Sequence, residues 1–196
     1  MTEHLDINQF QKIYQNTIDM FKARKYIMKE YYKCGKQIKI TDDDLIENYK
    51  NENCKLIINK GNDEILSVYF YNSKIGINEL KELFGRLQEE NVKHLILITK
   101  YKLTSYAKKE MKILGKNMEK ELFYFSEMIF NITKHELVPK HELLTEKETK
   151  IFVQNIGKKI PQIKITDKVC RYFNGKIDQI FRIYRKNEIY YRIVVA

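Results

Sequence analysis

The chain has 196 residues, a length that suits one large domain or two small ones. With 43% hydrophobic residues it can bury a core, and its 32% charged residues keep the surface polar. No apolar run approaches the roughly 20 residues that cross a bilayer, and the first residues lack the basic-then-apolar order of a signal peptide. We therefore expect an intracellular protein that has no membrane partner.

The formal net charge of +10 is unevenly distributed along the chain. Residues 93–120 carry eight lysines against two glutamates, and residues 126–196 also carry a basic excess, whereas residues 1–92 are almost balanced. A basic surface favours a polyanionic partner such as nucleic acid, and a solvated lysine-rich surface is the plain alternative. Because no recognition motif accompanies the charge, we expect contact with phosphates rather than with bases.

The three cysteines, Cys34, Cys54 and Cys170, are odd in number and far apart. No Cys-x-x-Cys pair is present, so the sequence favours neither a zinc ribbon nor a disulfide framework. We expect small buried or half-buried thiols instead. The glycines are scattered singly and form no phosphate-binding loop, and we predict that the protein needs no cofactor and no metal.

Residues 1–126 alternate between amphipathic helical patterns and β-rich runs. The run at residues 94–99, His-Leu-Ile-Leu-Ile-Thr, is typical of a central strand that is covered on both faces. This alternation predicts an N-terminal α/β domain with three α/β/α layers around a mixed sheet. The predicted elements are a helix over 6–34 that stops at Gly35, a helix starting at Thr41, strands at 54–59 and 65–71 joined by a hairpin turn at 60–64, a helix from Asn78 to Glu90, a strand at 94–99, a helix from Thr104 to Leu114 and a strand at 122–125.

Residues 127–196 predict a second, smaller domain of two-layer α+β type. Thr145 and Glu148 form a capping box for a helix that ends near Gly157. A unit of about 70 residues is small for an independent core, so we expect a partner to stabilise it. The remaining predicted elements are an extended piece at 162–165, a short helix at 169–173 and a terminal hairpin of strands 179–184 and 189–195.

Two groups of residues are candidates for chemistry. His135 and His141 flank a Glu-Leu-Val-Pro run, but a zinc-protease helix needs histidines at i and i+4, whereas these are six residues apart and Pro139 interrupts any helix. A metal-dependent nuclease with a restriction-endonuclease-like fold is the more specific alternative, and its candidate active-site residues are Glu64, Glu79 and Lys81. Glu79 and Lys81 fall in a predicted helix, where their side chains would diverge.

A specific resemblance begins at residue 129, in the run Ile-Phe-Asn-Ile-Thr-Lys-His-Glu-Leu-Val-Pro-Lys-His. This run resembles the signature of the fifth shared subunit of the eukaryotic nuclear RNA polymerases, whose archaeal counterpart has the C-terminal domain alone. Further matches lie on both sides of it, at Ala23–Lys25, Ile27–Met28, Lys74–Ile77, Leu87–Asn91, Thr104–Lys108, Pro161–Ile163, Asp167, Val169, Arg171–Phe173, Arg185 and Tyr191–Arg192.

The resemblance implies a non-catalytic subunit of a multisubunit DNA-directed RNA polymerase. Its N-terminal domain would be similar to restriction endonucleases without their active site, and would form part of the lower jaw near downstream duplex DNA. Its C-terminal domain would dock on the largest subunit, beside neighbouring small subunits. It also implies a nuclear location for a cellular protein, or the host cytoplasm, a viral factory or the virion for a protein of a large DNA virus.

Two sets of residues follow from this assignment. For the residues expected at the subunit interface, the alternative is a local role: the histidines would cap loops, and Tyr172 would belong to the core. A free-standing nucleic-acid-binding or chromatin protein is a third hypothesis for the whole chain. The residues expected to face DNA are Lys100, Lys102, Thr104, Ser105, Lys108 and Lys109, and those expected at the subunit interface or directly behind it are His135, Val138, Pro139, His141, Arg171, Tyr172 and Arg185.

Overall fold

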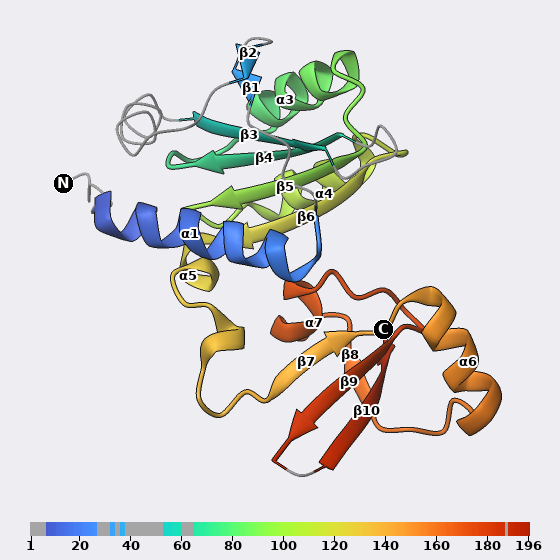
Figure 1. Cartoon of the computed structure of the whole chain (residues 1–196). Coiled ribbons are helices and arrows are strands. Elements are labelled where there is room, and N and C mark those ends of the chain that lie inside the picture. The colour runs from blue at the N-terminus through green and yellow to red at the C-terminus, as the bar shows by residue number, and fades with distance from the viewer. Residues whose placement is uncertain (1–6, 27–31, 34–35, 38–52, 60–64, 187) are drawn as a thin grey trace. The chain divides into compact units, whose positions relative to one another are not determined.

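The computed structural model describes residues 7–26, 32–33, 36–37, 53–59, 65–186 and 188–196 (Figure 1). The chain divides into two compact units, Met1–Phe130 and Asn131–Ala196, and the boundary expected from the sequence lies four residues earlier. Cys170 is a buried free thiol, and burial raises its pKa to about 11. The helix start at Thr41, the turn at 60–64, Glu64 and the side chains of Cys34 and Cys54 lie outside the described residues.

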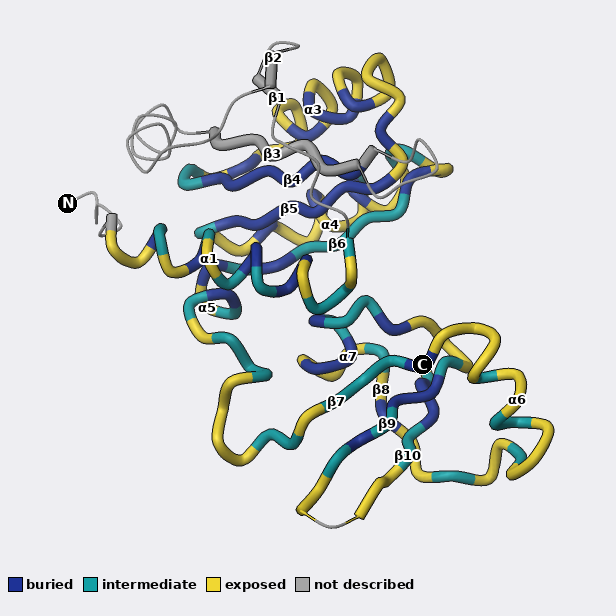
Figure 2. Tube along the Cα trace, viewed as in Figure 1, coloured by how far each residue is buried: buried dark blue, intermediate teal, exposed yellow. Residues whose placement is uncertain are grey.

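The first unit is built on a four-stranded mixed sheet in the order β3-β4-β5-β6. β3 pairs antiparallel with β4, and β4, β5 and β6 run parallel. All six residues of β5 are buried, as its continuous apolar run predicts, and its trace is dark in Figure 2. The strands are β3 (Asn53–Asn59), β4 (Ile65–Tyr71), β5 (His94–Thr99) and β6 (Glu119–Tyr124), and a separate antiparallel pair is formed by β1 (Tyr32–Lys33) and β2 (Lys36–Gln37).

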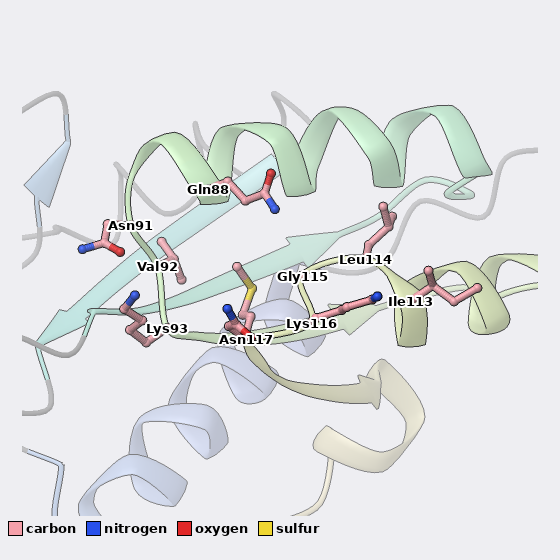
Figure 3. Close-up of a pocket in the computed structure, with 10 residues that line it drawn as sticks. Gln88, Asn91, Val92, Lys93, Ile113, Leu114, Gly115, Lys116 and Asn117 are labelled. Atoms are coloured by element: carbon pink, nitrogen blue, oxygen red, sulfur yellow. The ribbon is translucent and has the colours of Figure 1, made fainter.

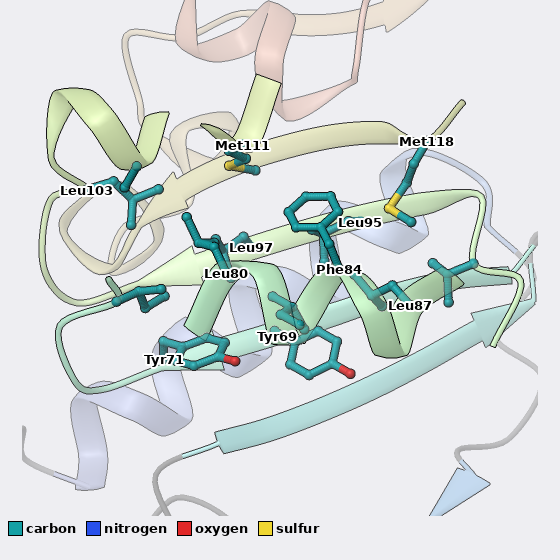
Figure 4. Close-up of a cluster of buried hydrophobic side chains, with 14 residues drawn as sticks. Tyr69, Tyr71, Leu80, Phe84, Leu87, Leu95, Leu97, Leu103, Met111 and Met118 are labelled. Atoms are coloured by element: carbon teal, nitrogen blue, oxygen red, sulfur yellow. The ribbon is translucent and has the colours of Figure 1, made fainter. Parts of the chain in front are cut away.

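Helices cover both faces of this sheet. On one face Phe10 of α1 packs edge-on against Phe70 of β4, with ring centroids 5.6 Å apart. On the other face α3 and α4 bury their apolar sides against Leu95 and Leu97 of β5 (Figure 4). The mixed α/β class is therefore confirmed for this unit. The helices are α1 (Ile7–Ala23), α3 (Ile77–Glu89), α4 (Ser105–Ile113) and α5 (Phe125–Met128).

Helix α1 is shorter than its apolar pattern predicts: it ends at Ala23, and Tyr32 already belongs to strand β1. Lys25 adopts a left-handed conformation with φ of 59°. The Tyr26 N–H then bonds to the Phe21 carbonyl at 3.0 Å, and the two rings stack 6.0 Å apart. This is the helix-ending turn in which a positive φ reverses the chain, and the Phe21–Tyr26 contact packs across it.

The residue after α1, Arg24, forms a buried ion pair with Glu121. Its guanidinium donates to both carboxylate oxygens of Glu121 in β6, at 2.7 and 2.8 Å, and Nε2 of His94 in β5 lies 2.9 Å from the same carboxylate. The side chains of Arg24 and His94 are 1% and 2% exposed. Burial alone would raise the pKa of Glu121, but Arg24 and His94 outweigh it and lower that pKa to about 2.

Asn16 connects α1 to the end of the first unit. Its side-chain amide donates to the main-chain carbonyls of Met128 and Ile129, at 2.8 and 3.0 Å. Both carbonyls lie at the end of α5, where a helix leaves its last acceptors without intrahelical partners. One amide thereby satisfies two of them.

Several predicted boundaries in this unit are wrong by one to three residues, and strand β6 begins at Glu119, three residues before its predicted start. Helix α3 begins at Ile77 after Gly76, not after Asn78, and the Glu79 carboxylate accepts the Gly76 N–H at 3.1 Å. Strand β6 ends at Tyr124, because the Tyr124 N–H bonds to the Glu127 carboxylate at 2.9 Å and Phe125 starts α5. In both places a glutamate three residues on supplies the cap.

The second unit contains a four-stranded sheet in the order β7-β9-β10-β8. β9 and β10 form the predicted terminal hairpin, and β8 runs parallel to β10. The capping box at Thr145 and Glu148 is confirmed, and α6 ends at Gly157 with φ of 86°. The elements are η1 (Ile132–Lys134), β7 (Lys140–Leu143), α6 (Glu146–Ile156), β8 (Gln162–Lys164), α7 (Lys168–Tyr172), β9 (Ile180–Arg185) and β10 (Glu188–Val195).

The small sheet is covered on both faces, so the predicted two-layer arrangement is wrong. Cys170 of α7 packs against Phe181 on one face. On the other, Phe152 of α6 contacts Tyr191, with ring centroids 4.5 Å apart. The strands carry apolar residues on both sides, a pattern that one covered face does not require. No described helix is long and apolar enough to span a membrane.

Replacing Glu121 by glutamine removes the buried charge that Arg24 needs. We expect the free energy of unfolding near neutral pH to fall by about 3 kcal/mol, because breaking one partner of a buried pair leaves the other uncompensated. Urea unfolding followed by circular dichroism measures this. The exposed Glu89→Gln substitution on α3 is the matched control, with an expected change within about 0.5 kcal/mol.

The same pair predicts a pH dependence. The pKa of Glu121 in the folded protein, about 2, lies below its ordinary value of 4.5. The pair therefore stabilises the folded protein fully above pH 4.5, and this stabilisation is lost as the pH falls from 4.5 toward 2. The wild type should lose on the order of 3 kcal/mol more than Glu121→Gln over this window. Parallel stability curves for the two proteins would contradict the prediction.

Candidate functional site

Residues 131–143 hold most of the motif that begins at Ile129, and they are here called the docking segment after the role that the sequence analysis expects of them. Its start is fixed by Asn131, whose side-chain oxygen accepts from the N–H and the hydroxyl of Thr133, at 3.0 and 2.6 Å. The amide of Asn131 also donates to the hydroxyl of Tyr172 in α7 at 3.2 Å. Tyr172 is only 6% exposed, so it supports the docking segment from behind.

Both predicted histidines of the docking segment bond to its own backbone. Nδ1 of His135 accepts the Leu137 N–H at 3.2 Å. Nδ1 of His141 lies 2.6 Å from the Pro139 carbonyl, and because a carbonyl only accepts, this nitrogen carries the hydrogen. Burial lowers the pKa of His141, whose ring sits edge-on to Phe181 at 6.1 Å. The histidines therefore fix the path of the segment.

The docking segment exposes one large apolar side chain, Leu137. It is 83% exposed, between the two histidines, whereas Val138 and Pro139 are half-buried. Sequence reasoning missed Leu137, because a leucine beside a valine ordinarily indicates core. The available signal was its position next to Val138 and Pro139, in the part of the motif between η1 and β7.

The sheet of the second unit adds Arg185 to this region. His141 pairs with Ile183 in the β7–β9 register, and alternate side chains share a face, so Arg185 lies on the same face as His141. The Arg185 side chain is exposed, with its guanidinium carbon 5.6 Å from the centre of the Tyr190 ring. Arg171 is half-exposed on α7.

The residues predicted to face DNA follow the carboxyl end of β5, in a stretch here called the basic edge (residues 100–109). The stretch is anchored at its start, because the Lys100 N–H donates to the Tyr71 carbonyl at 2.9 Å and the Thr99 hydroxyl donates to the Tyr101 carbonyl at 2.9 Å. Thr104 then caps α4, accepting the Ala107 N–H at 3.2 Å. Thr104 and Ser105 are exposed.

The lysines of the basic edge lie on the surface. Lys102, Lys108 and Lys109 are exposed, and Lys100 is half-exposed, with its ammonium 5.4 Å from the centre of the Tyr101 ring. The first turn of α4 contains no acidic residue, although the helix dipole favours acids there. Tyr106, 75% exposed in that turn, was not singled out from the sequence. Exposed lysines near a helix start that has no acid do not stabilise α4 through its dipole, but they are favourable for binding an anionic partner.

Two arrangements that could support metal chemistry have structural explanations. Among the described residues, His94, Glu119 and Glu121 come close enough to share an ion, but both oxygens of Glu121 already bind Arg24. Of the predicted nuclease set, Glu79 accepts from Gly76, and Lys81 points to Glu110 at 3.8 Å. These side chains do not converge.

Comparison with known proteins identifies the family. A family model described as RNA polymerase Rpb5, C-terminal domain, matches residues 130–195. A polymerase I, II and III subunit RPABC1 of Caenorhabditis briggsae is 31% identical over 141 residues, which span 68% of this chain and 67% of the relative. The chain belongs to the Rpb5 family. The predicted family is therefore confirmed, and the matched residues coincide with the second unit.

The Rpb5 likeness extends beyond the second unit. The RPABC1 subunit of Dictyostelium discoideum is 26% identical over 203 aligned residues, covering 97% of this chain and 99% of the relative. Subunit 5B of polymerases IV and V of Arabidopsis thaliana is 28% identical over 106 residues, 53% of this chain and 48% of the relative. The first unit is therefore part of the same relationship.

Replacing Asn131 by alanine should loosen the docking segment. The substitution removes the cap of η1 and the bond to Tyr172, so we expect a loss of about 1–2 kcal/mol in unfolding free energy. Amide hydrogen exchange at Thr133 should accelerate at the same time. Asn155→Ala, on the exposed side of α6, is the matched control. Unchanged exchange in Asn131→Ala would show that the segment is held by other contacts.

Proposed function

We propose that the chain is a non-catalytic subunit of a multisubunit DNA-directed RNA polymerase. The second unit docks on the largest subunit, and the first forms part of the lower jaw near downstream DNA, with a fold similar to restriction endonucleases but without their active site. The observation that carries the proposal is the Rpb5 match at residues 130–195, which contains the whole docking segment. The names of the relatives, all subunits of DNA-directed RNA polymerases, support it.

Docking through residues 131–143 agrees with the geometry of the segment. Its backbone is already held by the bonds of Asn131, His135 and His141, so binding costs little ordering entropy. Leu137 presents an apolar side chain that a pocket on the partner would remove from water. Arg185 supplies a cation on the face shared with His141. Val138 and Pro139 then serve as half-buried support.

Contact of the basic edge with DNA would be non-specific. Lys102, Lys108 and Lys109 are exposed and could neutralise phosphates, whereas the edge carries no pattern of amides and arginines that reads base pairs. Thr104 and Ser105 add hydroxyl groups at the start of α4, and half-exposed Lys100 adds a further cation at the start of the basic edge. With so few phosphate contacts, the isolated subunit should bind weakly and with strong salt dependence.

The proposal includes neighbouring small polymerase subunits as further partners and the nucleus as the location. The three relatives named above come from cellular organisms, so they give the viral alternative no support. A nuclease is not favoured, since Glu79 and Lys81 diverge on α3 and the relatives carry names of polymerase subunits.

Leu137→Asp should weaken docking. The side chain is exposed, so the substitution leaves the fold intact, while it places a charge where the partner offers an apolar pocket. We expect at least about a tenfold loss of the largest subunit in affinity purification from the native source, followed by mass spectrometry. The control Ile156→Asp makes the same change at an exposed site on α6. Equal recovery with both variants would place the docking surface elsewhere.

Charge reversal of the basic edge separates DNA engagement from assembly. The triple substitution of Lys102, Lys108 and Lys109 by glutamate should leave the recovered complex unchanged. It should reduce transcription and lower the slope of log affinity for duplex DNA against log salt by about one per lost phosphate contact. Reversal of Lys12, Lys22 and Lys74, also exposed on the first unit, is the control. Lost assembly with intact DNA engagement would overturn the division of roles.

A further inference from the structure

A cavity of about 480 Å³ lies between the ends of α3 and α4 in the first unit (Figure 3). Its volume falls in the range of sites that bind small ligands or single side chains. None of the site residues expected from the sequence lines it, and its lining shares no residue with the basic edge or the docking segment. The lining residues are Gln88, Asn91, Val92, Lys93, Ile113, Leu114, Gly115, Lys116, Asn117 and Met118.

The cavity walls are preformed, because both follow helix-ending turns with defined conformations. Asn91 has φ of 51°, and the Val92 N–H bonds back to the Leu87 carbonyl at 2.9 Å. Gly115 has φ of 60°, and a Cβ on it would lie 3.0 Å from ring carbons of Phe84. The turn after α4 therefore packs directly on the core, where only glycine fits.

The charge of the cavity is positive, although helix ends normally expose carbonyl groups. Two carbonyls at the end of α4 already accept a cation: the ammonium of Lys120 bonds to the carbonyls of Lys112 and Leu114, at 3.1 and 2.7 Å. The charged lining residues are Lys93 and Lys116, both exposed, and the lining contains no acid. A ligand in this cavity therefore meets the cations of Lys93 and Lys116.

The rest of the lining is apolar or amide-bearing. Val92 and Met118 are buried at 4% and 8% exposure, and Leu114 is half-buried beside them. Ile113 is 60% exposed at the rim, a large apolar side chain left in water. An apolar floor with a cationic, amide-lined rim is suited to an apolar side chain that has negative charges around it.

We propose that this cavity binds a short acidic peptide segment of a partner protein, with one apolar side chain against Val92 and Met118 and carboxylates at Lys93 and Lys116. Duplex DNA fits the surface less well. Its phosphate backbone gains nothing from the apolar floor, and interfaces with DNA are more polar than this lining. The carboxylates of a peptide can reach both lysines while its apolar side chain fills the space.

The test uses the full chain and a fluorescein-labelled hexapeptide in which a leucine–phenylalanine pair is flanked by two aspartates on each side. Fluorescence anisotropy should show binding, and the double variant Lys93→Glu/Lys116→Glu should weaken it about tenfold or more. Ile113→Ser should weaken it about threefold. The Gly115 amide resonance should shift on addition of the peptide to the wild type.

Two controls separate this site from the basic edge. Lys108→Glu/Lys109→Glu should retain the affinity for the peptide while losing affinity for duplex DNA, whereas the double variant of the cavity should do the reverse. A peptide with lysines in place of the aspartates should not bind. Thermal unfolding checks that each variant is folded, as expected for exposed positions.

The proposal is overturned if the acidic peptide fails to bind at about millimolar concentration, or if the cavity variant binds it as the wild type does. Displacement of the peptide by a short DNA duplex at lower concentration than the unlabelled peptide would also overturn it, and would assign the cavity to nucleic acid. None of these outcomes bears on docking to the polymerase, which is measured separately with Leu137→Asp.

Discussion

The first unit depends on the buried contact between Arg24 and Glu121. A guanidinium that is 1% exposed has lost its water, and only a complete set of partners makes that loss tolerable. The carboxylate supplies two bonds to it, and His94 holds the carboxylate in turn. Because Arg24 follows α1 while His94 and Glu121 lie on adjacent parallel strands, the contact fixes where the helix ends over the sheet. The layer that α1 forms, and the core beneath it, follow from that position.

The surfaces proposed for partners combine an irregular segment with the regular element that follows it, α4 for the basic edge and β7 for the docking segment. Thr104 fixes the basic edge at the start of α4, and Asn131 fixes the docking segment against α7. Binding residues are often placed on loops that a scaffold positions, since loops leave their side chains free of the core. The rigid part of each unit is a β-sheet that helices cover. This arrangement lets a small chain present several contact regions without a large interior of its own.

Local patterns in the sequence predicted the elements well where one physical signal acts alone. The continuous apolar run of β5 and the capping box at Thr145 are examples. The end of α1 was not predictable in the same way, because Lys25 takes a left-handed conformation for which no glycine or asparagine gave a sign. The ion pair of Arg24 joins residues far apart in the chain, and periodicity carries no information about such pairs. The exposure of Leu137 was hidden by its apolar character.

The two hydrogen bonds from the Asn16 amide to the carbonyls of Met128 and Ile129 have a consequence for the order of folding. These partners are separated by 112 and 113 positions, so the contact closes nearly the whole first unit. During synthesis α1 emerges first and waits for α5, the last helix of that unit, before its own packing is complete. Non-local closure of this kind slows folding and leaves early apolar surface exposed. The nascent first unit therefore keeps part of the apolar surface of α1 unpacked until residue 129 has been made.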